Sequence, residues 1–255
     1  MIELEVTSWD DFGNALEQID ENRKEPKEKS GLAIRRPLFR GVSNATWGLE
    51  TTLERAFPME CSAQELSLVS YYRKLARSLP AVETMTGRKW DDLPDPPEFE
   101  RLISEETGWL DGFLGRNNAI YRYLIYLRHH GFPSPLLDWT QSPYVAAFFA
   151  FDSMGKDVRE VAIYTLVRGR FHTMSNTEHF FVVGPYVRTH ARHYLQQSQY
   201  SLCVCQQTQG TGENRLIDYT FQSHYDALRR ASNRKENTFV KIKIRASLTQ
   251  PSQLR

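Results

Sequence analysis

Residues 128–151 read RHHGFPSPLLDWTQSPYVAAFFAF, and the fold is predicted from this stretch outward. A turn containing Gly and Pro precedes the apolar pair Leu136-Leu137, which predicts a short buried strand ending in the polar triplet 138–140. Ser142 can cap a following helix, and Pro143 suits its first position. We expect this helix to bury a face formed by Val145, Ala146, Phe149 and Ala150. Polar groups at the end of a buried strand are well placed to meet a ligand.

Several short motifs follow one another in a fixed order along the chain. The turn carries His129-His130-Gly131, the strand ends in Leu136-Leu137-Asp138-Trp139-Thr140, and the helix contains Ala146-Ala147-Phe148-Phe149-Ala150. Far upstream stand Phe39-Arg40-Gly41 and Trp47-Gly48-Leu49. This arrangement resembles the FRG-domain family, which is named for the Phe-Arg-Gly triplet. The resemblance covers most of the chain and has a divergent middle.

Length and composition bound the class of protein. The 255 residues suit one large domain or two small ones, and we expect a single domain over 1–255. A net charge of +1 predicts no strong attraction of the whole molecule to nucleic acid or membrane. It does not exclude a local basic groove. The first 21 residues are acidic, and no stretch is long and apolar enough to span a bilayer. These features favour a cytoplasmic protein without a membrane partner.

The cysteines argue against both disulfides and zinc. There are three of them, Cys61, Cys203 and Cys205, and an odd number indicates reduced thiols. A zinc site would need a second Cys or His pair at ligand spacing, and the sequence has none. Two-metal chemistry would need clustered carboxylates, whereas Asp138 stands alone with Asp152 well down the next helix. We therefore expect no metal.

Periodicity and turn residues predict the elements of the chain. Strands are expected at 2–6, 31–39, 160–167, 180–183, 200–205 and 238–244, and helices at 9–19, 61–78, 100–104, 109–127 and 219–231. Pro80 is expected to close the second helix, and Arg40 to stand at the end of its strand. The segments 86–99 and 206–214 are expected to be loops. The result is an α+β chain with a mostly helical insertion at about 60–127.

The same order of residues also resembles a second layout. The sequence has no Gly-x-Ser-x-Gly, no Walker phosphate loop and no Gly-x-Gly-x-x-Gly turn. It does have Arg40 on an early strand, the triplet 138–140 before a helix, and Gln196-Gln197 before a late strand. This resembles the arginine–serine–glutamate layout of mono-ADP-ribosyltransferases. The resemblance implies a split β-sheet core with flanking helices and a site that displaces nicotinamide from NAD.

The resemblance also implies roles for individual residues. Arg40 would hold a phosphate or ribose of NAD, and Thr140 would brace the strand beside nicotinamide. Tyr144 or Phe148 would supply a flat ring for stacking, with Trp139 as a further platform. Gln196 or Gln197 stands where the superfamily has glutamate, and an amide can bind ribose hydroxyls but cannot carry a negative charge. Asp138 would then supply the carboxylate, or His129 the base, since an ordinary histidine pKa of ~6.5 suits proton transfer near neutrality.

Structural alternatives remain open for each of these residues. Arg40 could be a surface charge, His129 a core histidine and Trp139 a core residue. Asp138 could pair with Arg40 or Arg55 instead of contacting a ligand. The aromatic run 121–127 favours a core helix over a surface on which nucleobases stack.

The leading hypothesis is therefore a toxin-like transferase that moves ADP-ribose from NAD to a macromolecule. The FRG resemblance implies a phage-defence or toxin–antitoxin setting with a neutralising partner protein. RNA or DNA is the preferred acceptor, because 188–193 and 229–235 are basic and could follow a phosphate backbone. The alternatives are a nucleic-acid-binding or nuclease domain without NAD chemistry, and a regulatory module without chemistry.

Overall fold

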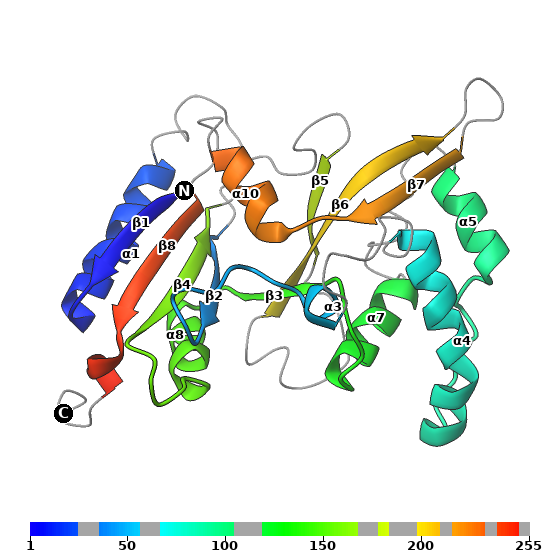
Figure 1. Cartoon of the computed structure of the whole chain (residues 1–255), viewed down its shortest axis with the longest axis horizontal. Coiled ribbons are helices and arrows are strands. Elements are labelled where there is room, and N and C mark those ends of the chain that lie inside the picture. The colour runs from blue at the N-terminus through cyan, green and yellow to red at the C-terminus, as the bar shows by residue number, and fades with distance from the viewer. Residues whose placement is uncertain are drawn as a thin grey trace.

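One mixed sheet of eight strands runs through the molecule (Figure 1). The computed structural model describes residues 1–24, 36–56, 67–104, 119–167, 178–183, 198–209, 216–232 and 239–249. The strand order is β1-β8-β4-β2-β3-β6-β5, and β7 pairs with β6 beside this path. Strands β1 and β8 are parallel, and all other pairs are antiparallel. The fold is thus a mixed α and β arrangement, as expected.

Apart from β7, which was not expected as a strand, the strands lie close to their expected positions, with some differences at their ends. Their bounds are β1 Ile2–Val6, β2 Leu38–Val42, β3 Leu137–Thr140, β4 Glu160–Leu166, β5 Glu178–Val183, β6 Ser198–Gln209, β7 Leu216–Phe221 and β8 Phe239–Arg245. Arg40 therefore stands in the middle of its strand, whereas it was expected at the end. The first residues of the expected loop 206–214 belong to β6, because they pair with β7.

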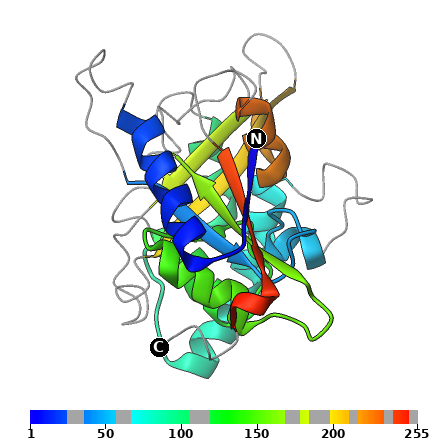
Figure 2. The ribbon, with the colours of Figure 1, turned by 90° about the vertical axis from the view of Figure 1, so that its left-hand side faces the viewer.

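Helices α1 (Trp9–Lys24) and α8 (Pro143–Asp152) cover one face of the sheet at the β1–β8–β4–β2 end (Figure 2). Phe12 and Ile19 of α1 are buried there, as expected from their spacing. On α8 the buried residues are Ala146, Ala147 and Ala150, while Phe149 is 41% exposed. The expectation that Phe149 is buried was wrong, because the helix lies against the sheet through its small side chains.

The opposite face of the same strands carries a second apolar cluster. Helix α10 (His224–Ser232) packs there through Ala227 and Leu228, against side chains that include Tyr164 and Phe239. The sequence predicted one helix over 219–231, but Tyr219 belongs to β7 and the helix begins only at His224. The cross-strand pairing with β6 decides the conformation of this segment.

The remaining helices lie at the other end of the sheet, beside β6 and β7 (Figure 1). They are α3 (Thr52–Ala56), α4 (Leu68–Thr86), α5 (Pro96–Ser104) and α7 (Ala119–His129). Pro80 lies inside α4 and does not close it. The helix ends where Gly87 adopts a left-handed conformation with φ of 69°, which favours glycine. Tyr121 and Tyr123 are buried, so the aromatic run 121–127 is part of a core helix.

None of the described helices combines the length and the apolar character needed to cross a membrane. The described cysteines, Cys203 and Cys205, are free thiols, and Cys61 lies outside the described residues.

Candidate functional site

The sheet opens between β2 and β3. Strand β2 joins β4 through five residue pairs, but it joins β3 through the single pair Phe39–Thr140. A cavity of about 710 Å³ lies at this opening. Its lining includes Arg40, Trp47, Arg55, His129, Asp138 and Phe149. This volume is within the ~300–1,000 Å³ of small-molecule sites, so the opening can hold a ligand of cofactor size.

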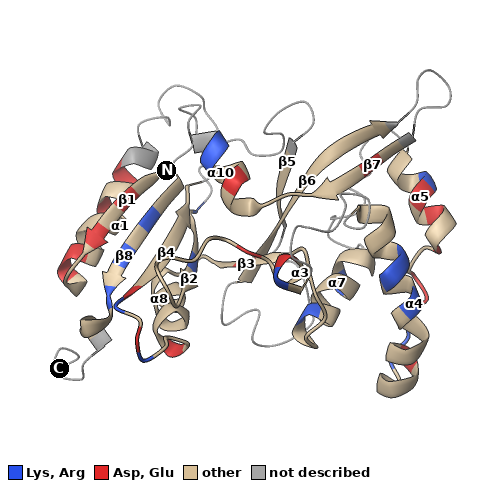
Figure 3. Cartoon of the chain, in the orientation of Figure 1, with Lys and Arg blue, Asp and Glu red and all other residues tan. Residues whose placement is uncertain are grey.

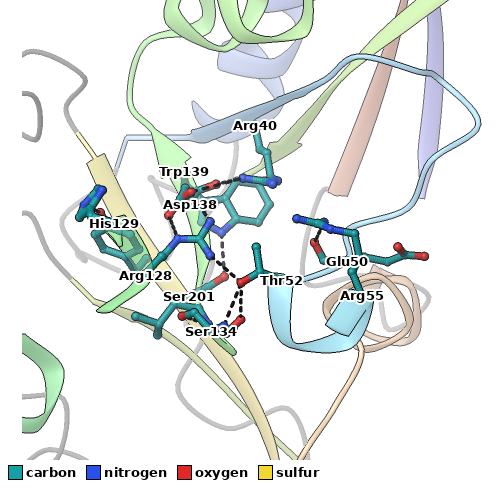
Figure 4. A network of polar contacts seen from close by, with 12 residues as sticks. Arg40, Glu50, Thr52, Arg55, Arg128, His129, Ser134, Asp138, Trp139 and Ser201 are labelled. Atoms are coloured by element: carbon teal, nitrogen blue, oxygen red, sulfur yellow. Dashed lines mark hydrogen bonds and ion pairs between the residues drawn. The ribbon is translucent and has the colours of Figure 1, made fainter. Parts of the chain in front are cut away.

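Arg40 projects from the centre of β2 across the opening to β3 (Figure 4). Its Nη1 donates to the main-chain oxygen of Asp138 at 3.0 Å and lies 4.0 Å from Oδ2 of the same residue. Burial lowers the pKa of Arg40 to about 10, so its guanidinium stays charged at neutral pH. Arg40 is therefore a partly buried cation that lines the cavity, with 20% of its side chain exposed, and the surface-charge alternative is wrong.

Asp138 is held by an arginine that the sequence did not single out. Arg128 Nε donates to Oδ1 at 2.7 Å, and its Nη2 donates to Oδ2, so the guanidinium grips both carboxylate oxygens. Desolvation by the surrounding strands would raise the pKa of Asp138. The charges of Arg128 and Arg40 and the hydrogen bonds from Arg128 outweigh it and lower that pKa. Asp138 is thus a stable anion and a weak base.

The expected partners of Asp138 were Arg40 or Arg55. Arg40 takes part, but Arg55 donates from Nη1 to the main-chain oxygen of Glu50 at 2.9 Å instead. The position of Arg128 in the last turn of α7, just before the turn that leads to β3, is the one local signal that could have indicated its role.

The side chain of Thr52 contacts Arg128 and is itself bonded to the main chain of Ser134 (Figure 4). Thr52 Oγ1 accepts from the main-chain N–H of Ser134 at 2.8 Å and from Nη1 of Arg128 at 3.4 Å. Thr52 opens α3, where Thr51 and Glu54 bond to each other's main-chain N–H groups in a capping box. The ion pair between Arg128 and Asp138 therefore joins α3, α7 and β3.

His129 and Thr140 both line the cavity. His129 is exposed, lines the cavity and places Nε2 3.4 Å from the hydroxyl of Tyr200, so the core-histidine alternative is wrong. Thr140 Oγ1 accepts from the main-chain N–H of Ser142 at 3.1 Å, which connects the end of β3 to the cap of α8. Both residues were predicted to belong to the site.

Trp139 serves the core as well as the cavity. Its ring is buried, and its Nε1 donates to Oγ of Ser201 at 2.7 Å on the neighbouring strand. One edge of the residue also lines the cavity. The sequence left both roles open, and the geometry gives Trp139 the larger part in packing.

Comparison with known proteins identifies the family. Residues 35–159 match the model of the FRG domain. This segment is assigned to the FRG-domain family. The matched segment holds Arg40, Arg128, Asp138 and Thr140 and ends just before β4. Searches of curated proteins and of solved structures returned no match for this chain.

Of the three aromatic residues expected at the cavity, Trp139 lines it, whereas the other two do not. Tyr144 and Phe148 are 65% and 61% exposed, and neither lines the cavity. Tyr144 instead packs edge-on against Phe12 of α1, with ring centroids 6.1 Å apart. Trp47, which is 56% exposed, and Phe149 both line the cavity. Trp47 belongs to the Trp-Gly-Leu motif, which was the signal available for finding it.

The third predicted strand reaches the site, but the two glutamines are not described. Gln196 and Gln197 lie outside the described residues, as does the basic stretch 188–193. Ser198, the first residue of β6, lines the cavity and is the register partner of Thr140. Within the described ranges, no cluster of His, Cys, Asp or Glu could hold a metal ion.

Proposed function

We propose that this FRG domain is an NAD-dependent mono-ADP-ribosyltransferase and that the cavity between β2 and β3 is its NAD site. The supporting observation is the convergence of three distant segments on one cavity. Arg40 and Asp138 stand 98 positions apart yet touch, and Ser198 at the start of β6 lines the same space. An ADP-ribosyltransferase-like split core also agrees with the single residue pair between β2 and β3.

The site residues suggest how NAD would lie. The Arg40 guanidinium suits bidentate binding of the pyrophosphate, and its placement between the strands fixes its direction. Trp47 and Phe149 offer flat faces at the cavity for the nicotinamide or adenine ring. Gln196 or Gln197 would bind ribose hydroxyls from the strand that follows, and Thr140 would brace the nicotinamide side.

The reaction would break the bond between C1′ of the ribose and the nicotinamide nitrogen, which takes the electron pair. The acceptor atom would then bond to C1′, and its proton would pass to a base or to water. Stabilising the positive charge that develops on the ribose is the main task of such a site. The carboxylate of Asp138 would stabilise this positive charge only in part, because Arg128 donates hydrogen bonds to both of its oxygens.

We propose RNA or DNA as the acceptor, in preference to a protein hydroxyl. Asp138 is a weak base here, and a glutamine cannot deprotonate an acceptor. An exocyclic amine of a nucleobase needs little help of this kind. His129, exposed at the cavity, is the residue placed to take the proton. Glu50 also lines the cavity, and Glu50→Gln tests whether a carboxylate acts as base.

Labelled NAD incubated with separate pools of RNA, DNA and protein tests this function. Label on a macromolecule with wild-type protein, and its loss with Arg40→Lys, is the expected result. Label confined to protein would contradict the acceptor, and abolition by Glu50→Gln would contradict the reasoning about the base. The absence of label from all three pools would contradict the enzyme class.

Figure 3 shows where the described charged residues lie, and their positions bear on where a nucleic acid would bind. Acidic residues gather on β1 and α1, while the described Lys and Arg residues are spread over many elements, among them α4, α7, β8 and α10. Of the expected basic segment 229–235, Arg229 lies 4.0 Å from Asp226 and is partly neutralised. A binding domain without NAD chemistry is the second candidate, favoured by the engagement of Asp138 with Arg128. RNA binding without label would support it.

The cellular role follows from the family resemblance. We propose a cytoplasmic toxin used in phage defence or a toxin–antitoxin pair, with a protein that neutralises it. Expression in a bacterial host should arrest growth, and Arg40→Lys should relieve the arrest at equal protein levels. Growth arrest that persists with Arg40→Lys would separate toxicity from this site.

A further inference from the structure

We propose that Arg128 is a positioning residue that keeps the charge of Arg40 available to a phosphate group in the cavity. It does so by occupying the carboxylate of Asp138, which would otherwise pair with Arg40. The inference rests on the proposed function in taking that phosphate to be part of NAD. Arg128 itself is not among the residues that line the cavity, so it would act through Asp138 without touching the ligand.

The contacts show how the carboxylate is divided between the two arginines. Arg128 donates to Oδ1 at 2.7 Å and also to Oδ2, so both oxygens are engaged on one side. Nη1 of Arg40 donates to the main-chain oxygen of Asp138 at 3.0 Å and lies 4.0 Å from Oδ2. The carboxylate therefore belongs to Arg128, and Arg40 holds the backbone of the same residue.

The charges of these three residues do not cancel. Two guanidinium groups and one carboxylate leave one net positive charge, and Arg40 is the member that faces the cavity. An anion entering the cavity would meet a cation that Asp138 neutralises only in part, because Nη1 of Arg40 lies 4.0 Å from Oδ2 while Arg128 donates to both carboxylate oxygens. A phosphate is attracted to such a site more strongly than to one in which Arg40 and Asp138 form a closed pair.

Loss of Arg128 would change this balance without touching Arg40. The side chain of Asp138 is 42% exposed and could turn towards the nearest remaining cation, which is Arg40. The resulting pair would be neutral and would compete with an incoming phosphate. Arg40 would still be present and still be charged, but it would bind anions weakly.

One double substitution distinguishes this role from simple packing, because the two roles predict different effects on pyrophosphate affinity. If Arg128 only stabilises the contact between α7, β3 and α3, Asp138→Asn should recover stability by removing an unpaired carboxylate, but it should not raise the pyrophosphate affinity of the folded protein that lacks Arg128. If Arg128 acts by neutralising Asp138, then Asp138→Asn should undo the effect of Arg128→Gln. The double variant restores one net positive charge at Arg40.

The experiment measures binding of inorganic pyrophosphate, and separately of NAD, by calorimetry at fixed ionic strength. The proteins are wild type, R128Q, D138N and the R128Q/D138N double variant. We expect R128Q to weaken pyrophosphate binding about tenfold or more, and the double variant to recover most of that loss. D138N alone should bind pyrophosphate at least as tightly as wild type. A double variant as weak as R128Q, or weaker, would overturn the proposal.

Two further variants control for folding. Arg122 lies on the same helix and pairs with Asp92 at the surface, so R122Q removes an arginine of α7 without reaching the cavity. It should leave pyrophosphate affinity unchanged, and a loss equal to that of R128Q would overturn the proposal. If R128Q does not fold, D138N decides, since binding weaker than wild type would contradict the proposed role of the carboxylate.

These binding measurements, combined with the labelled-NAD transfer assay, separate this inference from the proposed function. If pyrophosphate follows the expected pattern but NAD yields no transfer, the role of Arg128 stands and the enzyme class fails. If transfer from NAD occurs but the double variant shows no recovery, the enzyme class stands and the inference fails. If wild type binds neither pyrophosphate nor NAD, both fail.

Discussion

A Cβ atom placed on Gly41 would lie 1.9 Å from the main-chain oxygen of Ala146 and 2.8 Å from the main-chain nitrogen of Ala150. The backbone of α8 thus passes directly over β2, beside Arg40. The glycine of the Phe-Arg-Gly triplet and the alanines of α8 are two sides of one contact. Larger side chains at either place would push the helix away from the wall of the cavity.

Gly41→Ala should therefore destabilise the protein by about 3 kcal/mol, because backbone atoms of α8 cannot yield as a flexible side chain would. Gly13→Ala is the matched control, since a Cβ on Gly13 of α1 meets no atom within 4 Å. That variant should gain roughly 0.5–1 kcal/mol from the higher helix propensity of alanine. Urea unfolding of both variants measures the difference. Equal unfolding free energies for Gly41→Ala and the wild type would contradict the close contact between α8 and β2.

Arg40→Lys should abolish most of the transfer activity while the fold persists. Lysine keeps the positive charge and one donor for the main-chain oxygen of Asp138, but it loses the two-pronged grip on phosphate. We expect the NAD dissociation constant to rise about tenfold or more, with far-UV circular dichroism unchanged. Full activity in this variant would remove Arg40 from the site.

The aromatic wall of the cavity can be tested with a pair of neighbours on α8. Phe149→Ala should weaken NAD binding about tenfold, whereas Phe148→Ala should not, because only Phe149 lines the cavity. Trp47→Ala should weaken NAD binding to a similar degree. Titration of NAD, followed by calorimetry, compares the three variants. A loss confined to Phe148→Ala would restore the original expectation for stacking.

His224 should make stability depend on pH. Burial lowers the pKa of this histidine to about 3, whereas in the unfolded chain it is ordinary at ~6.5. Between these values the unfolded state binds the extra proton, so stability falls as pH decreases from about 6.5. The loss is up to ~1.4 kcal/mol per pH unit.

His224→Leu should flatten the dependence of unfolding free energy on pH between about 7 and 5. His130→Gln is the comparison variant, because it removes an exposed histidine that directly follows α7. Denaturant unfolding at several pH values gives both slopes. Identical slopes for His224→Leu and wild type would contradict the effect of burial.

The unit of β3 and α8 was predictable from sequence because its signals are local. Ser142 accepts from the main-chain N–H of Val145 at 3.3 Å, and Pro143 opens the helix, as the sequence indicated. The segment 219–228 shows the opposite case. Phe221, Tyr225 and Leu228 have helical spacing, but pairing of Phe221 with Val204 holds the first part as a strand. Such pairing depends on residues that sequence spacing cannot reveal.

The candidate site divides in the same way. The motifs predicted that Arg40, Asp138 and Thr140 belong to one site, and all three line one cavity in the structure. Arg128 was not predicted, because an arginine near a helix end is usually a solvated surface charge. Its importance comes from the turn that brings α7 back against β3, which no spacing within α7 indicates.

The bond from Arg40 to the main-chain oxygen of Asp138 carries a consequence for the history of the family. In a regular sheet that oxygen would accept from a neighbouring strand, and here a side chain takes the place of the strand. Arg40 is thus needed to complete the backbone as well as to meet a ligand. A descendant that lost the proposed chemistry would still be selected to keep this arginine. Trp47, which is exposed at the cavity, has no comparable duty through its indole ring. Drift at position 47 would therefore mark an inactive relative sooner than drift at position 40.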